Sequence, residues 1–225
     1  MRRVAYYGVL LFLVMLLLAC SGRVLSVTAV PSEDQQAVYA RGKAMLHHGL
    51  SGKIDASFIA YRKDSALIEV AVINDQKQTF LFGPENVTVQ LKGSSGAASP
   101  CVVYTFEQLL SQGDSSFAWD GVSSAVGIAG SFIPGGWGST VAQSVLKMGV
   151  KEGKRQSAEP EELSPKAIKD RYLRLHSLSP DSEYYAGLLK IGLPRTVKGG
   201  DLLEIRVNFL EQREQLTFHF EKPQK

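Results

Sequence analysis

The four histidines and two cysteines of this 225-residue sequence could act as nucleophiles, general bases or metal ligands. They are His47, His48, His176, His219, Cys20 and Cys101. Imidazoles bind metals and transfer protons near neutral pH, and a thiolate is both a nucleophile and a metal ligand. The two adjacent histidines would point about 100° apart on a helix, and His176 and His219 each stand alone on a predicted strand. The sequence therefore predicts no metal site.

Short motifs that carry catalysis in several enzyme classes are missing. Neither H-E-x-x-H nor G-x-S-x-G occurs, and the glycines do not form the phosphate-binding pattern G-x-x-x-x-G-K-[ST]. Cys101 precedes two valines, which favours a small buried residue over a reactive thiol. We expect no catalytic residues, no cofactor and no enzymatic activity. The alternative is an envelope hydrolase whose site is assembled in space from distant residues.

The elements that must position these residues begin with a hydrophobic amino terminus. Arg2 and Arg3 precede an unbroken apolar run over residues 9–18. This run is short for a bilayer span, which needs about 20 residues, and its layout is that of a signal peptide. Alternatives are a plain secretory signal, in which Cys20 is incidental, and an uncleaved anchor.

The end of this segment, Leu17-Leu18-Ala19-Cys20, resembles the lipobox of bacterial lipoproteins. The resemblance implies a signal peptide over residues 1–19, cleavage between Ala19 and Cys20, and attachment of diacylglycerol and a further acyl chain, such as palmitate, to Cys20. Several acyl chains together hold a soluble domain stably at a bilayer. In such lipoproteins an Asp after the cysteine favours the inner membrane. Ser21 here implies the periplasmic side of the outer membrane.

The charge of the chain gives no support to a nucleic-acid partner. Part of the formal net charge of +3 comes from Arg2 and Arg3, and without them 23 basic residues face 22 acidic ones. Binding to a phosphate backbone requires a clear basic excess. The two cysteines predict no internal disulfide, because Cys20 is assigned to lipid.

The mature chain is predicted to be an antiparallel β-sandwich of immunoglobulin-like type, with seven or eight strands. Residues 203–209 and 216–220 alternate apolar and polar side chains on either side of a polar link, which is typical of a hairpin with one buried face. Residues 172–178 and 183–191 are expected to form another strand pair. The Cys-Trp-Cys framework of immunoglobulin domains is absent, so the prediction concerns architecture alone.

The predicted sandwich domain covers residues 51–225. Residues 20–50 are expected to form a lipidated tether with a short helix near residues 35–46. Residues 114–163 are expected to interrupt the sandwich with a helical hairpin, rich in Gly, Ala and Ser, and a charged linker. Ser164 and Pro165 are predicted to start a short helix after that linker.

An uncharged stretch over residues 124–146 forms most of the expected hairpin. Asp120 can cap its first helix, and Pro134 followed by two glycines ends that helix and turns the chain. This break leaves arms too short to span a membrane. The hairpin is expected either to pack on the sandwich or to expose Phe132 and Trp137 to a protein partner or to the membrane interface.

These observations favour a non-catalytic binding or assembly module of the cell envelope. Its expected partners are the membrane, through the lipid on Cys20, and an envelope protein. A lipoprotein that binds the membrane interface through its hairpin is the second alternative to this function.

Overall fold

The computed structural model describes eight segments of the chain. They are residues 25–33, 35–40, 43–48, 53–119, 124–125, 164–180, 183–209 and 212–222. Fourteen strands lie in these described segments, and the predicted mainly β fold, with antiparallel sheets packed on each other, is confirmed.

The first sheet has five strands, each antiparallel to its neighbours. In spatial order they are β1 (Ser26–Ala29), β14 (Gln212–Glu221), β13 (Leu202–Phe209), β7 (Val87–Lys92) and β8 (Ala98–Pro100). The predicted carboxy-terminal hairpin is confirmed as β13 and β14, in which Leu203 pairs with Phe218 and Ile205 with Leu216. These four side chains are fully buried, so the alternation in the sequence marks the inner face of the sheet.

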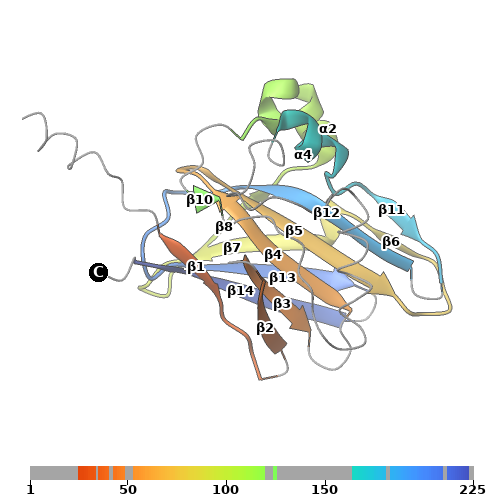
Figure 1. Cartoon of the computed structure of the whole chain (residues 1–225), viewed down its shortest axis with the longest axis horizontal. Helices are drawn as coiled ribbons and strands as arrows, with labels where there is room; N and C mark the ends of the chain where they lie inside the picture. The colour runs from red at the N-terminus through yellow and green to blue at the C-terminus, as the bar shows by residue number, and fades with distance from the viewer. Residues whose placement is uncertain are drawn as a thin grey trace, which may run out of the picture.

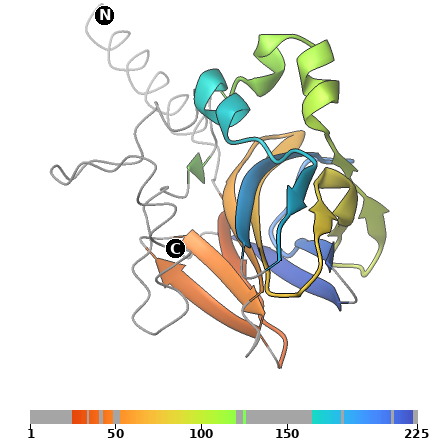
Figure 2. The ribbon, with the colours of Figure 1, turned by 90° about the vertical axis from the view of Figure 1, so that its right-hand side faces the viewer.

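The second sheet has six strands along its main path. In spatial order they are β2 (Gln35–Ala40), β3 (Lys43–His48), β4 (Ile54–Tyr61), β5 (Ser65–Asn74), β12 (Glu183–Gly192) and β9 (Val102–Val103). A two-residue strand, β10 (Ser124–Ala125), pairs with the end of β4. A separate pair, β6 (Phe80–Phe82) and β11 (His176–Leu178), lies at one end of the molecule, at the right in Figure 1 and at the front in Figure 2.

The core lies between the inner faces of the two sheets. Phe58 of β4 contacts Phe218 and Phe220 of β14, with ring centroids 5.7 and 5.6 Å apart. All eight residues of β4 are buried, so this strand is covered on both faces. Aromatic pairs of this geometry contribute stability beyond the area that they bury.

The chain passes from one sheet to the other at both edges of the sandwich. Residues 30–34 connect β1, an edge of the first sheet, to β2, an edge of the second. At the opposite edge Cys101 connects β8 to β9, and its backbone N–H donates to the carbonyl of Val89 at 2.9 Å. Each crossing links an edge strand of one sheet to the neighbouring edge strand of the other. Fewer backbone N–H and carbonyl groups are therefore left exposed and unpaired at these edges.

Four short helices in the described segments cover connections between strands. They are η1 (Pro84–Asn86), α2 (Phe106–Ser111), η2 (Asp114–Phe117) and α4 (Pro165–Asp170), where η marks a 3-10 helix. Helix α4 starts as predicted, because the Ser164 hydroxyl accepts from the N–H of Ala167 at 3.2 Å. Helix η2 contacts both α2 and α4, and the three short helices gather at the top of both views (Figures 1 and 2).

The helix predicted near residues 35–46 is wrong, because these residues form β2 and β3. Lys, Ala, Met and Leu favour a helix locally. Here Met45 and Leu46 pair with Ser57 and Ala56 of β4, and this distant partner determines the local structure. The sandwich therefore starts before residue 51: strands β1, β2 and β3 all precede it, in the segment that was expected to be a tether.

Two further predictions are corrected. The segments near residues 172–178 and 183–191 do not form the predicted strand pair, because β11 pairs with β6 and β12 pairs with β5 and β9. An isolated parallel bridge between Tyr172 and Leu188 joins the two segments instead. Ser124 and Ala125 form β10, so a helix continuing from Asp120 is wrong at these two residues. The other residues of the predicted helical hairpin, 126–148, lie outside the described residues.

Candidate functional site

One end of the sandwich collects the features that could carry a function, and we call it the Leu25 end. Leu25 is the first described residue, and the start of β1, the β4–β5 turn and the loop after β12 lie together there, at the left of Figure 1. The Tyr61 hydroxyl accepts from the N–H of Leu25 at 2.7 Å and donates to its carbonyl at 3.2 Å. Both backbone groups of Leu25 are therefore tied to the end of β4.

The core holds the Tyr61 ring in place. Its side chain is buried, and its ring packs edge-on against Phe220, with centroids 5.4 Å apart. Phe58 lies on the same strand, 6.3 Å from the Tyr61 ring. Because packing restrains this ring, its hydroxyl offers Leu25 a fixed donor and acceptor.

A basic residue follows Tyr61 in the tight turn between β4 and β5. The Arg62 N–H donates to the Ser65 carbonyl at 2.7 Å, and the Arg62 guanidinium lies 4.8 Å from the centre of the Trp119 ring. A cation over an indole face is stabilised by the ring quadrupole. Nε and Nη2 of Arg62 and Nε1 of Trp119 are buried, and among the described residues none of these three donors has a hydrogen-bond partner.

A second cation lies near Arg62. The Lys190 ammonium donates to the carbonyl of Ser116 at 2.7 Å. Burial lowers the pKa of Lys190, and the positive charge of Arg62 lowers it further, whereas Asp64 opposes this shift. No carboxylate of the described segments forms an ion pair with Arg62 or Lys190, so this part of the molecule is rich in donors.

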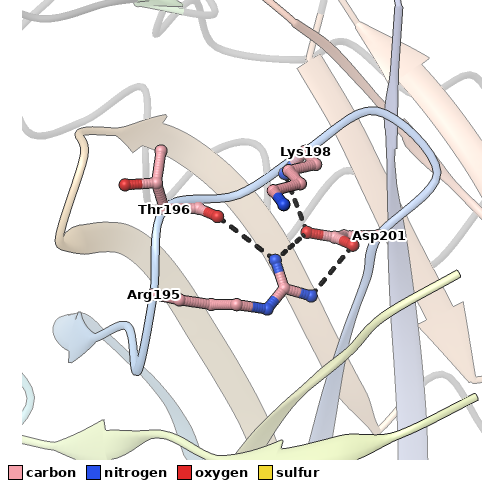
Figure 3. Close-up of polar contacts among 4 residues, drawn as sticks. All are labelled: Arg195, Thr196, Lys198 and Asp201. Carbon is pink, nitrogen blue, oxygen red and sulfur yellow. Dashed lines mark hydrogen bonds and ion pairs between the residues drawn. The ribbon is translucent and has the colours of Figure 1, made fainter. Parts of the chain in front are cut away.

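The loop after β12 is closed by an ion pair (Figure 3). Both terminal nitrogens of Arg195 bond the Asp201 carboxylate, at 2.6 and 3.0 Å, and the Lys198 N–H donates to it at 2.7 Å. Burial favours the neutral acid, but the hydrogen bonds from Arg195 and Lys198 outweigh this effect, so the pKa of Asp201 lies below its ordinary value. The same contact raises the pKa of Arg195. These bonds are internal to the loop and hold its shape.

The two histidines whose side chains the structure describes, His176 and His219, are not brought into one site. His176 stacks on Tyr185 with ring centroids 4.7 Å apart, and His219 lies 3.3 Å from Glu221 on β14. The Thr28 hydroxyl donates to Glu221 at 2.8 Å, so it approaches the carboxylate and not the imidazole. A nucleophile–base relay requires a bond from the hydroxyl to the imidazole, and this arrangement does not provide it.

Cys101 lines an open groove of about 430 Å³ beside β7. Burial raises the pKa of its thiol to about 11, although a backbone hydrogen bond at Leu91 partly opposes the shift. The thiol is therefore protonated at neutral pH, where a nucleophile needs the thiolate. Cys101 is half-buried, so it is more exposed than the small buried residue that the sequence predicted.

The described residues contain neither a candidate metal site nor a membrane-spanning helix. No group of three His, Cys, Asp or Glu side chains in the described segments could hold a metal ion. No helix among those segments combines the length and the apolar character needed to cross a membrane.

The predicted site residues Ala19, Cys20, Phe132 and Trp137 all lie outside the described residues. The sequence analysis missed Tyr61, Arg62 and Trp119. A Tyr-Arg-Lys-Asp turn after an apolar strand was the available signal for the first two. Comparison of the chain with protein-family models, with curated proteins and with solved structures found no match.

Proposed function

We propose that this protein is a lipid-anchored, non-catalytic binding or assembly module of the cell envelope, held on the periplasmic side of the outer membrane through Cys20. The observation that carries the proposal is the double hydrogen bond between Tyr61 and Leu25. It fixes the start of the sandwich only five residues after the cysteine of the lipobox-like sequence.

This spacing gives the anchor a short reach. Five residues of fully extended chain span at most about 18 Å, since each contributes at most about 3.6 Å. An acyl chain on Cys20 would therefore keep the Leu25 end close to the lipid headgroups. The β6–β11 pair lies at the other end of the molecule (Figure 1), so it would be farther from the membrane.

The predicted partner surface starts near the same end. Strand β10 lies within the segment between Trp119 and Ser164, and it pairs with Tyr61 and Ala60 at the end of β4. The expected hairpin with Phe132 and Trp137 continues from β10 along the chain. A partner bound by this hairpin is recognised close to the bilayer, which suits a module that assembles with other envelope proteins.

A non-catalytic role is supported by the chemistry of the described residues. Cys101 is a protonated thiol, and His176 stacks on Tyr185. His219 lies beside the Glu221 carboxylate on β14. These arrangements do not activate a nucleophile.

The anchor is tested by intact-mass analysis of protein purified from its native membranes. The expected species begins at Cys20 and carries the mass of a diacylglycerol and an acyl chain, and Cys20→Ser abolishes this species. Density-gradient separation of the membranes then places the acylated form in the outer-membrane fraction. A species that keeps Met1, or one that begins at Cys20 without added lipid, contradicts the proposal.

The binding role is tested with a photo-crosslinking residue at Trp137, compared with one at Leu81 on the opposite end. We expect a discrete crosslinked partner from position 137 and none from position 81. As a second variant, a flexible Gly-Ser linker of about 15 residues after Ser21 adds roughly 20 Å of mean reach and is expected to weaken this crosslink. Equal crosslinking from both positions contradicts partner recognition at the Leu25 end.

A further inference from the structure

Two side-chain nitrogens of Arg62 have no hydrogen-bond partner among the described residues. These nitrogens, Nε and Nη2, lie side by side on one edge of the guanidinium plane and direct their hydrogens the same way. Such a pair of parallel donors matches two oxygens of a phosphate or a carboxylate. Burying these N–H donors without a hydrogen-bond partner costs free energy, so a bound acceptor would stabilise them. Arg62 as a whole is partly exposed, although these two nitrogens are themselves buried.

Trp119 provides a third donor beside Arg62. Its side chain is only 4% exposed, and its indole N–H is buried without a partner among the described residues. An indole N–H can only donate a hydrogen bond, so its partner must be an acceptor. The Arg62 guanidinium lies 4.8 Å from the centre of the same indole ring, so the two side chains are neighbours.

Lys190 adds positive charge to these donors. Its ammonium donates to the carbonyl of Ser116 at 2.7 Å, three residues before Trp119 in the chain. Asp64 is the described carboxylate that acts on Lys190; its side chain is exposed and accepts a hydrogen bond from the Ser65 hydroxyl at 3.1 Å. A ligand of these three side chains would therefore carry negative charge and accept several hydrogen bonds.

We propose that Arg62, Trp119 and Lys190 form a binding site for a phosphate group at the Leu25 end of the sandwich. A phosphate suits such a set of donors better than a carboxylate, because it has more acceptor oxygens and they point in tetrahedral directions. A free phosphate and the phosphate of a lipid headgroup share this chemistry. The site is independent of the acylation of Cys20, although an acylated Cys20 brings it within reach of headgroups.

The experiment uses the fluorescence of Trp119 in the full-length chain. The protein has two tryptophans, so a Trp137→Phe background leaves Trp119 as the sole reporter. This protein is titrated with inorganic phosphate in nonionic detergent micelles, with chloride holding the ionic strength constant. We expect a saturable change in emission.

Two variants in this background separate the site from general charge attraction. Arg62→Lys keeps the charge but loses the paired donors, and we expect binding to weaken at least about tenfold, the effect of losing a charged hydrogen bond. Lys63→Gln removes the neighbouring exposed charge and is expected to change binding less than about twofold. Thermal unfolding of both variants verifies that they fold. If Arg62→Lys does not fold, the titration of the parent protein still decides whether the site exists.

A lipid arm distinguishes the two sources of phosphate. The same protein is placed in nanodiscs of phosphatidylglycerol, and inorganic phosphate is added. Loss of the phosphate response relative to micelles assigns the site to the headgroup, and an unchanged response assigns it to free phosphate. The absence of any phosphate response in micelles together with identical emission in micelles and nanodiscs overturns the proposal, as does an equal loss in Arg62→Lys and Lys63→Gln. Mass analysis of Cys20 is a separate readout, so failure of the anchor and failure of this site are distinguishable.

Discussion

Arg195 holds both carboxylate oxygens of Asp201 across a loop of five intervening residues. The carboxylate is nearly fully buried, with 4% of its side chain exposed, whereas 38% of the Arg195 side chain is exposed. Removing the acid leaves the Lys198 N–H without this acceptor, but the freed guanidinium can reach water. The loop is therefore expected to depend on Asp201 more than on Arg195.

Asp201→Asn is expected to lower the free energy of unfolding by about 1–2 kcal/mol at pH 7, after allowance for the solvent around Arg195. The folded pKa of Asp201 lies below 3.8, so its contribution is complete well above pH 3.8 and is lost as the pH falls through 3.8 and below. Urea unfolding from pH 7 to pH 3 measures the difference between the two proteins, which should shrink below about pH 4. As a control, Asp75→Asn removes an exposed pair with Lys53 and should cost less than about 1 kcal/mol. A difference that stays constant down to pH 3 would contradict the assigned pKa shift.

Tyr61→Phe removes the hydroxyl that binds Leu25 and keeps the ring that packs on Phe220. We expect a loss of about 1 kcal/mol and faster amide hydrogen exchange along β1. Tyr185→Phe is a matched control, because the Tyr185 hydroxyl bonds the N–H and carbonyl of Arg174 in the same way. Exchange along β1 should be unchanged in the control, and a β1 that exchanges equally in both variants would refute the role of Tyr61.

Gly187→Ala is expected to destabilise the protein by about 2–3 kcal/mol. A Cβ at this position would lie 2.6 Å from the Cα of Leu173, and backbone cannot move aside as a side chain can. At Gly192 the nearest atom would be a ring carbon of Tyr104 at 3.1 Å, so Gly192→Ala should cost less. Thermal or urea unfolding measures the loss of stability in each variant. A larger loss in Gly192→Ala than in Gly187→Ala would contradict the expected clash with the Leu173 backbone.

Cys101 is expected to react slowly with thiol reagents. With its pKa raised to about 11 from 9.0, the thiolate fraction at pH 8 is about a hundredfold lower than that of an exposed cysteine. The labelling rate should rise about tenfold for each pH unit between pH 7 and pH 10. Unfolding in urea should restore fast labelling, and a fast reaction in the folded protein at pH 7 would disprove the buried, protonated thiol.

The sequence predicts those parts of the fold in which one face of a strand meets water. In β13 and β14 apolar and polar residues alternate because the sheet has a buried and an exposed side. In β4 this signal is weak, because all its residues are buried. In β2 and β3 the local preference for helix misleads, since the partner of Met45 and Leu46 is another strand of the sheet.

The candidate site was beyond sequence reasoning for a related reason. Tyr61 and Leu25 are 36 residues apart, and Arg62 and Trp119 lie even farther apart along the chain. No periodicity connects such pairs, because they meet only after the sheets have packed. What the sequence does provide is the chemistry of each residue: a basic turn after an apolar strand and an isolated tryptophan before a glycine-rich stretch.

The position of β14 has a consequence for biosynthesis. This last strand of the chain lies inside the first sheet, where it pairs with β1 on one side and β13 on the other. A nascent chain therefore lacks the strand that pairs with β1 until β14 has been made. Premature termination removes an interior strand and not a peripheral one, so truncated products cannot close the core and are suited to removal by proteases.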